Sequence, residues 1–251
     1  MLVKQRIIQS GNQIELMDFK NPISINENTV LNPNGRNGNP ELYTEEEYQE
    51  NKKENRKKTL QRNISKLWRL YHSNQGKYKT RDKFITLTFR ELPDCIISAD
   101  LQLNKFIKRL KKYARSKIQY LGTRELQKEN DRNGIHYHLI LFGCPFIPHH
   151  ELLKIWCSHN PYMDEKIPSG VNIKAIKDGL GDMTNYLTLY QVKELLEDDF
   201  IEGHKTLIKS MNLIQPVVTD YETILHIPNA EDIKKGLSFL DNKITYYRIE
   251  Q

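Results

Sequence analysis

Residues 133–142, NGIHYHLILF, place two histidines one residue apart in an otherwise apolar run. Such a run predicts a β-strand, and side chains two residues apart on a strand point to the same face of the sheet. His136 and His138 therefore share one face, and Ile135, Tyr137 and Leu139 share the other. A buried imidazole without a polar partner costs about 1–3 kcal/mol, so the histidine face is expected to contain such partners.

The segment before this strand supplies a third candidate ligand. IQYLGTRELQ, residues 118–127, predicts a strand, and KENDRNG, residues 128–134, predicts a polar turn, so the two strands form an antiparallel hairpin. Glu125 then lies opposite His136 or His138, and directly opposite side chains have Cβ atoms about 5 Å apart. One carboxylate and two imidazoles suit Mg²⁺ or Mn²⁺ and can also hold Zn²⁺. Sheet histidines held only by hydrogen bonds are the alternative.

The segments around this hairpin predict an α+β fold, with a central antiparallel sheet and helices packed on it. In the first strand, Thr86 and Thr88 alternate with apolar residues, and Asp100 is the expected N-cap of the first helix. Because the helices are dispersed between the strands, the pattern does not favour a purely parallel sheet. The other predicted strands are residues 83–92 and 171–176, and the predicted helices are residues 101–117, 149–159 and 180–199.

The chain on either side of these elements is predicted to form extensions. Residues 1–43 are rich in Asn, Pro and Gly and predict irregular structure, with one short strand near Gln13 to Met17. Thr44 and Glu47 have capping-box spacing, so a helix is expected to begin there and continue through the basic segment that follows. We therefore expect an N-terminal loop region and basic helix at 1–82, a main domain at 83–198 and a C-terminal extension at 199–251.

Positive charge is concentrated in two segments of the chain. Lys52–Lys83 contains 12 Lys and Arg residues against two acids, and Lys105–Lys117 contains seven and no acid, although the net charge is only +6. Separation of charge in this way favours a polyanionic partner such as nucleic acid. The residues expected to contact duplex or hairpin DNA are Lys57, Lys58, Arg62 and Arg69, and those expected to contact the strand near the site are Lys108 and Arg109.

Composition narrows the class of protein further. A chain of 251 residues with 38% hydrophobic residues is long enough to bury one domain core with appendages. No apolar run reaches the roughly 18 residues of a membrane span, and the first residues lack an apolar signal-peptide core, so we expect a soluble cytoplasmic protein. Three cysteines without C-x-x-C spacing argue against a disulfide framework and a zinc ribbon.

The last predicted helix carries a second group of candidate residues, in NYLTLYQVKE, residues 185–194. At about 100° per residue, Tyr186, Tyr190 and Lys193 fall within roughly 60° of one another on the helix. A phenol with a pKa near 10 is a weak nucleophile at neutral pH. It becomes effective where a metal polarises a phosphorus centre and an ammonium offsets the developing charge. Tyrosines at this spacing also occur in ordinary helix packing.

FITLTF, the strand with the glutamate, GIHYHLILF and YLTLYQVK occur here in one order. This combination resembles the HUH (His-hydrophobe-His) endonucleases, and within them the rolling-circle replication initiators of small plasmids and single-stranded DNA phages. The resemblance covers residues 83–193. It implies a palm-type antiparallel sheet, a bacterial host cell, and a divalent metal, Mg²⁺ or Mn²⁺, bound by His136, His138 and Glu125.

The same resemblance implies a reaction and its partners. A tyrosine attacks a phosphate of single-stranded origin DNA, which leaves a 5′-phosphotyrosine and a free 3′-hydroxyl for a host polymerase. Tyr190 with Lys193 matches the family's Y-x-x-K pattern, and Tyr186 provides the second tyrosine of the two-tyrosine subgroup. Leu189 departs from the pattern, since many relatives have lysine there. The sequence has no P-loop motif, so unwinding is expected to need a host helicase.

Three alternatives stay open at this point. A transposase or relaxase of the same family would perform the same chemistry, usually with one tyrosine in the small transposases. A non-catalytic DNA-binding protein would use the histidines for structure alone. A zinc hydrolase unrelated to DNA would leave the separation of charge unexplained.

Overall fold

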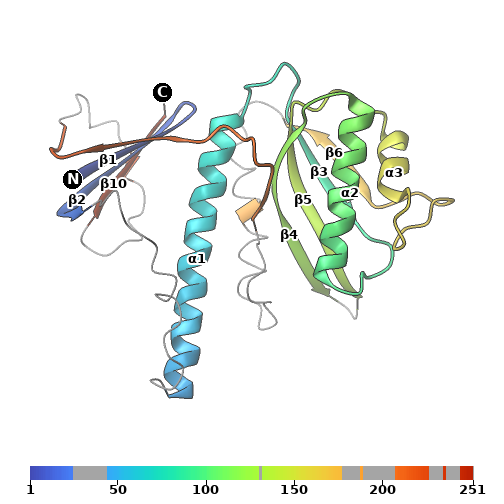
Figure 1. The fold of residues 1–251 in the computed structure, drawn as a ribbon, viewed down its shortest axis with the longest axis horizontal. Helices are drawn as coiled ribbons and strands as arrows, with labels where there is room; N and C mark the ends of the chain where they lie inside the picture. Colours follow the sequence, from blue (N-terminus) through green and yellow to red (C-terminus); the bar gives the residue numbers. More distant parts are fainter. Residues whose placement is uncertain are drawn as a thin grey trace. The chain divides into compact units, whose positions relative to one another are not determined.

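Two five-stranded antiparallel sheets organise the chain (Figure 1). The computed structural model describes residues 1–24, 44–129, 132–176, 187–188, 207–225, 234–235 and 244–250. The chain divides into two compact units, Met1–Asn55 with Ile214–Gln251 and Arg56–Leu213. Each unit contains one of the sheets, and the predicted α+β class is confirmed.

The first unit contains strands from both ends of the chain. Its strand order is β8-β1-β2-β10-β9, so the first two strands pair with segments that follow residue 213. Arg6 on β1 and Asp220 on β8 form an ion pair, with 2.6 Å between Arg6 Nε and Asp220 Oδ1. The strands are β1 (Leu2–Ser10), β2 (Gln13–Ser24), β8 (Val217–Tyr221), β9 (Lys234–Lys235) and β10 (Ile244–Glu250).

The prediction of irregular structure before residue 25 was wrong, because β1 and β2 form a hairpin there. Inward positions of these strands include Gln5, Ser10 and Glu15, and this mixture of polar and apolar residues hides the strand periodicity. Gln5 is held inside by a 2.8 Å hydrogen bond from its side-chain amide to Asp18. The turn begins at Gly11, whose φ of 62° favours glycine, and Gly-Asn was the hairpin signal in the sequence.

The second unit is built around the predicted central sheet, with strand order β6-β3-β5-β4-β7. The histidine strand β5 lies in the middle, between β3 and β4, and every pairing is antiparallel. The strands are β3 (Lys83–Thr88), β4 (Gln119–Glu129), β5 (Arg132–Phe142), β6 (Val171–Ala175) and β7 (Leu207–Lys209). Because β7 and the buried Leu213 belong to this unit, the predicted extension at 199–251 is divided between the two units.

Helices α2 (Ile96–Ala114) and α3 (His149–Cys157) cover one face of this sheet (Figure 1). Leu103, Phe106 and Leu110 of α2 and Trp156 of α3 pack against the face of β5 that carries Tyr137. This is the face expected from the alternation in NGIHYHLILF. The histidines are thereby left on the opposite face.

The predicted start of α2 was wrong. The helix begins at Ile96, and the N-cap is Cys95, whose sulfur accepts a hydrogen bond from the amide of Ser98. Asp100, the expected cap, lies inside the helix, where its carboxylate binds side chains of the sheet. Sequence reasoning favoured Asp because cysteine is not among the preferred capping residues. Tyr113 was expected in the buried stripe and is exposed.

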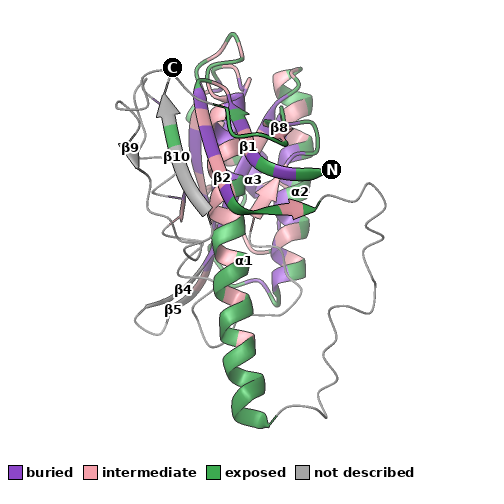
Figure 2. Ribbon diagram, turned by 90° about the vertical axis from the view of Figure 1, so that its left-hand side faces the viewer, coloured by how far each residue is buried: buried purple, intermediate pink, exposed green. Residues whose placement is uncertain are grey.

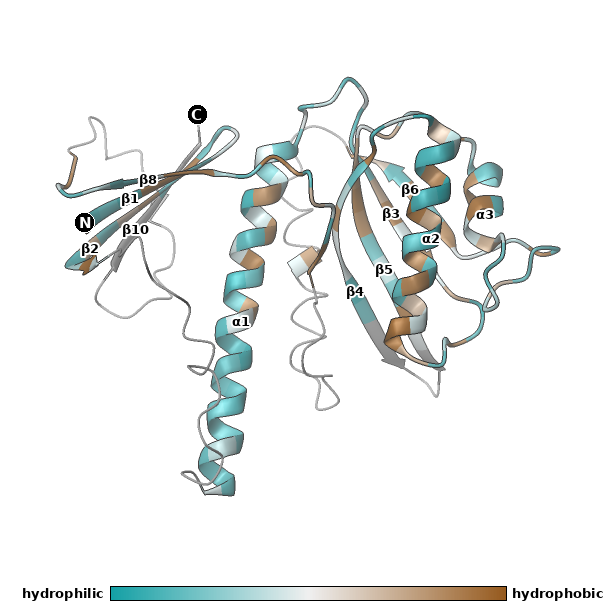
Figure 3. Cartoon of the chain, in the orientation of Figure 1, coloured by the Kyte–Doolittle hydropathy of each residue, from teal (hydrophilic) through white to brown (hydrophobic). Residues whose placement is uncertain are grey.

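Helix α1 (Glu45–Asn74) begins at the predicted capping box. The Thr44 amide donates to Glu47 Oε2 at 2.9 Å, and the Glu47 amide donates to Thr44 Oγ1 at 3.3 Å. Its first half is exposed and hydrophilic, and apolar residues gather toward its end (Figures 2 and 3). There Leu67, Leu70 and Tyr71 are buried in the core on the histidine side of the sheet. Among the described residues, none of the helices has the length and apolar character needed to cross a membrane.

Candidate metal centre on the central sheet

The three predicted ligands come together on one face of the central sheet. Glu125 on β4 lies directly opposite His136 on β5, which decides between the two registers that the sequence allowed. One ligand atom from each of Glu125, His136 and His138 can be chosen so that all lie within 4.8 Å of one another. Adjacent antiparallel strands produce this group, because opposite residues and residues two apart share a face.

His138 is fixed by contacts on three sides. Its Nε2 atom lies 2.9 Å from Glu125 Oε2, and its Nδ1 atom lies 3.2 Å from Oγ1 of Thr86 on β3. The ring of Phe84 stacks on the imidazole, with ring centroids 6.0 Å apart and an interplanar angle of 12°. His138 is only 4% exposed, so these contacts satisfy a ring that water cannot reach freely.

His136 is half-buried, and its ring centroid lies 6.4 Å from that of His138. Burial lowers the pKa of His136; the charge of Glu125 opposes this effect and His138 adds to it. Its imidazole is therefore more readily neutral than an exposed one. A neutral imidazole is the form that binds a metal, because its lone pair is available.

The chemistry of this donor set fits a divalent cation. A carboxylate and two imidazoles are ligands for Mn²⁺ or Zn²⁺, and further oxygen atoms from a substrate phosphate would also suit Mg²⁺. The His138–Glu125 hydrogen bond places two ligand atoms around one shared proton, and a cation would replace that proton. Thr86 would keep the His138 ring oriented through Nδ1, as partners behind metal ligands commonly do.

The opposite face of the same two strands holds a polar cluster that the sequence did not reveal. Arg124, next to Glu125, is 1% exposed, and its Nη1 atom donates to both carboxylate oxygens of Asp100 at 3.1 Å. The Tyr137 hydroxyl donates to Asp100 Oδ1 at 2.5 Å. Burial, and secondarily the charge of Asp100, raises the pKa of Tyr137, so this phenol remains a donor. Asp100 thus ties α2 to the strands that carry the ligands.

The residues predicted to contact DNA fall on two different faces of the sheet. Helix α1, on the ligand side, carries Lys57, Lys58 and Arg62, which are exposed, and Arg69, which is half-buried. Lys108 and Arg109 lie on α2, on the face opposite the three ligands, so the structure does not bring them to the site.

Arg109 has a structural role on its face of the sheet. Its Nη1 atom donates to the Ser158 carbonyl at the end of α3, and burial lowers its pKa. Hydrophobic spacing on α2 could have indicated that its basic residues face away from the histidines, because one helix face must cover the Tyr137 side of the sheet.

The predicted tyrosine residues Tyr186 and Tyr190, with Lys193, lie outside the described residues. Residues 187 and 188 are described and are helical. Leu187 is buried in the same core as Phe84 and Ile140, on the ligand side of the sheet.

Comparisons with known proteins place the ligands within a recognised family segment. No curated protein matches the chain. Among solved structures, the chain is similar to the hypothetical protein ORF119 from Sulfolobus islandicus rod-shaped virus 1. That match has 17% identity, covers 53% of this chain and 94% of that chain, and has a TM-score of 0.32. The model of the "Replication-associated protein ORF2" family matches residues 82–194, a segment that contains all three ligands and is consistent with a replication initiator.

Proposed function

We propose that the protein is a replication initiator that nicks and rejoins single-stranded DNA at a specific site. The observation that carries this proposal is the convergence of Glu125, His136 and His138 on the central sheet within the matched segment. A divalent cation held there, Mg²⁺ or Mn²⁺, would polarise the scissile phosphate and so favour attack on phosphorus. The basic, exposed first half of α1 supports a polyanionic substrate.

In the proposed reaction, a tyrosine supplies the nucleophile. Its oxygen forms a bond to phosphorus, the bond from phosphorus to the 3′ oxygen breaks, and the 3′ oxygen leaves with a proton as a hydroxyl. Tyr190 is the proposed first nucleophile, with Lys193 offsetting charge, and Tyr186 would reverse the reaction on a second strand. Leu187, adjacent in sequence to Tyr186, is buried on the ligand side of the sheet, which supports this assignment.

Incubation with labelled single-stranded oligonucleotides and Mn²⁺, followed by mass mapping of any DNA-linked peptide, tests the proposal directly. We expect a covalent adduct on the peptide that contains residues 185–194, and we expect Tyr190→Phe to abolish it. An adduct that persists in Tyr190→Phe would assign the first step to Tyr186. His138→Ala should remove the adduct and leave DNA affinity at matched salt unchanged, whereas His150→Ala, an exposed histidine on α3, should change neither.

Two alternatives make different predictions in the same assay. A transposase or relaxase with one active tyrosine would tolerate Tyr186→Phe in both cleavage and joining. A non-catalytic DNA-binding protein would bind DNA equally well with and without a chelator and would form no adduct. A polymerase and a helicase of the host are the partners that an initiator would require.

A further inference from the structure

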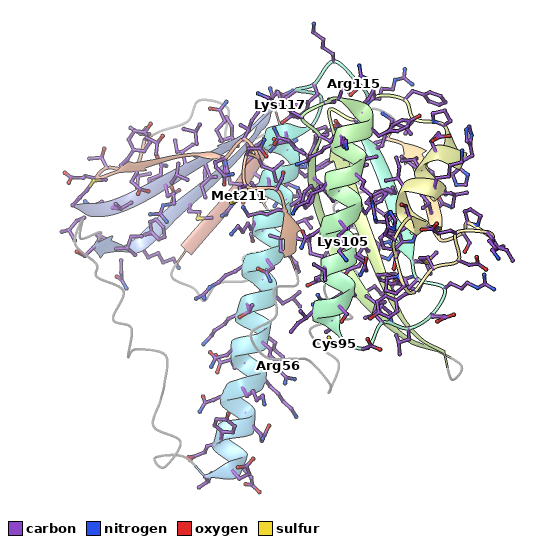
Figure 4. The ribbon with its side chains drawn as sticks, turned by 45° about the vertical axis from the view of Figure 1, so that its right-hand side comes forward. Arg56, Cys95, Lys105, Arg115, Lys117 and Met211 are labelled. Carbon is purple, nitrogen blue, oxygen red and sulfur yellow. The ribbon has the colours of Figure 1, made fainter. Side chains whose placement is uncertain are left out.

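The two basic segments of the sequence meet at one end of the central sheet. The first ends in the connection from α1 to β3, which carries Lys77, Lys79 and Arg81. The second ends in the last turn of α2 and the connection to β4, which carry Lys112, Arg115 and Lys117. All six are exposed, and we name them the basic rim. Figure 4 shows Arg115 and Lys117 together at the end of α2 that lies away from Cys95.

Packing between the two connections holds the rim together. The ring of Tyr78 lies 3.2 Å from the position that a Cβ atom would take on Gly143, and the Lys117 carbonyl oxygen lies 3.8 Å from the same position. Ser116 Oγ donates to the Gly143 carbonyl at 3.0 Å. The Tyr78 ring packs inward, with its centroid 6.1 Å from that of Phe142. The cations are therefore carried on connections fixed to the sheet.

The charge of the rim is not offset nearby. The acid in the first connection, Asp82, is 6% exposed, and its Oδ2 atom accepts a hydrogen bond from the Gly76 amide. The second connection contains no acid. Within the described part of the chain, none of the six cations forms an ion pair. Six exposed cations at one end of a domain form a strong site for a polyanion.

We propose that the basic rim binds the phosphate backbone of duplex DNA that flanks the cleavage site; this rests on the proposed function. Duplex DNA has one charge per roughly 1.7 Å of its axis, twice the density of one strand. Single-strand surfaces combine cations with exposed stacking rings, but Tyr78, the aromatic residue between Lys77 and Lys79, is turned toward Phe142. The first connection therefore offers charge without a stacking platform.

The position of the rim sets the length of DNA that it requires. At about 3.3 Å per residue, Phe142 lies about 13 Å along β5 from His138. At about 3.4 Å per base pair, the rim is reached only by an arm longer than about four base pairs beyond the cleavage site. The rim contacts the arm through phosphates, so the sequence of the arm is unimportant.

The test compares Lys79→Gln with Lys117→Gln in one chain against a matched control, Lys154→Gln with Lys166→Gln, which removes two charges elsewhere in the same unit. The probe is a single strand with a duplex arm at either end, measured by fluorescence anisotropy across a salt series. We expect the rim variant to bind more weakly and its log–log salt slope to become shallower by about 2, and the control to behave as wild type. Shortening the arm to about three base pairs should remove the difference between them.

Equal salt slopes for the rim variant and the control would overturn the proposal. An equal loss on an unpaired strand of the same length would overturn the assignment to duplex DNA. Cleavage of a short single-stranded oligonucleotide should be unchanged in the rim variant, since the rim lies away from the three ligands. If wild type cleaves nothing, the proposed function fails, but the binding comparison still decides on the rim.

Discussion

At the level of single residues, the hydroxyl of Thr86 determines which nitrogen of His138 is available to a ligand. Its Oγ1 atom occupies the Nδ1 side of the ring, so Nε2 faces Glu125 and the other imidazole. In a metal-bound state, Nδ1 would carry the proton and donate to Thr86, which leaves the lone pair of Nε2 for the metal. Thr86 is therefore a positioning residue for the candidate site.

Thr86→Val should weaken binding of Mn²⁺ by about 10- to 100-fold, because the ring of His138 loses the partner that fixes its orientation. Isothermal titration calorimetry on the full chain measures this change. Thr219→Val, the same replacement on β8 of the other sheet, is the matched control and should bind Mn²⁺ as wild type does. Unchanged affinity in Thr86→Val would mean that the ring is held by Phe84 and Glu125 alone.

The three cysteines should differ in reactivity and in pH dependence. Cys95 is exposed, and hydrogen bonds from Ser98 lower its pKa, so a larger fraction is thiolate at neutral pH. Burial raises the pKa of Cys144 and of Cys157, which keeps both as thiols. Alkylation followed by peptide mass spectrometry should modify Cys95 first, at a rate that rises with pH. Equal rates for all three in the native protein would contradict this order.

At the level of elements, α2 is tied to the ligand strands by one carboxylate. Asp100 binds Arg124 and Tyr137, which lie opposite each other on β4 and β5 and alternate with the three ligands. A buried guanidinium needs such a partner, because an unpaired buried charge is strongly destabilising. The helix is thus registered against the two strands by polar contacts as well as by its apolar stripe.

Asp100→Asn should lower the free energy of unfolding by about 1–2 kcal/mol, a moderate value because Asp100 is partly exposed. The amide keeps an acceptor for Tyr137 but removes the charge opposite Arg124. Urea unfolding with a constant slope would measure the change. Arg90→Gln breaks the exposed Arg90–Asp164 pair and should cost less than about 1 kcal/mol. Equal costs for the two variants would show that burial of Arg124 adds nothing.

At the level of the whole molecule, two compact units give the chain two sources of stability, and the three ligands belong to one of them. A cation that binds only the folded form stabilises that form by mass action. The effect should appear in the unit that contains Glu125, His136 and His138. The other unit, which contains β1 and β8, should be unaffected.

Calorimetry with and without Mn²⁺ tests this separation. At a concentration about 100-fold above the dissociation constant, binding should stabilise the ligand-containing unit by about 2.7 kcal/mol. For a unit of this size, that corresponds to a rise in Tm of about 5–10 °C. His138→Ala should abolish the rise and His150→Ala should preserve it. An equal rise for both units, or none, would contradict binding at this cluster.

Much of the central sheet and its site could be predicted from the sequence, because strict alternation and local turns are properties of neighbouring residues. NGIHYHLILF fixed which face carries the histidines, and the hairpin brought Glu125 to that face. The capping box at Thr44 and Glu47 was equally local. Helix α2 was predicted in type but not in its start, since Cys95 is an uncommon cap.

Other features were decided only by the tertiary structure. The pairing of β1 with β8 and of β2 with β10 joins residues more than 200 positions apart, and no local pattern encodes such a partner. Asp100 looked like a helix cap until α2 was placed on the sheet beside Arg124 and Tyr137. The sequence alone determined the donor set of the candidate site, because a strand's alternation is local. Only packing could decide what supports that site and where the two basic segments meet, because those contacts depend on distant parts of the chain.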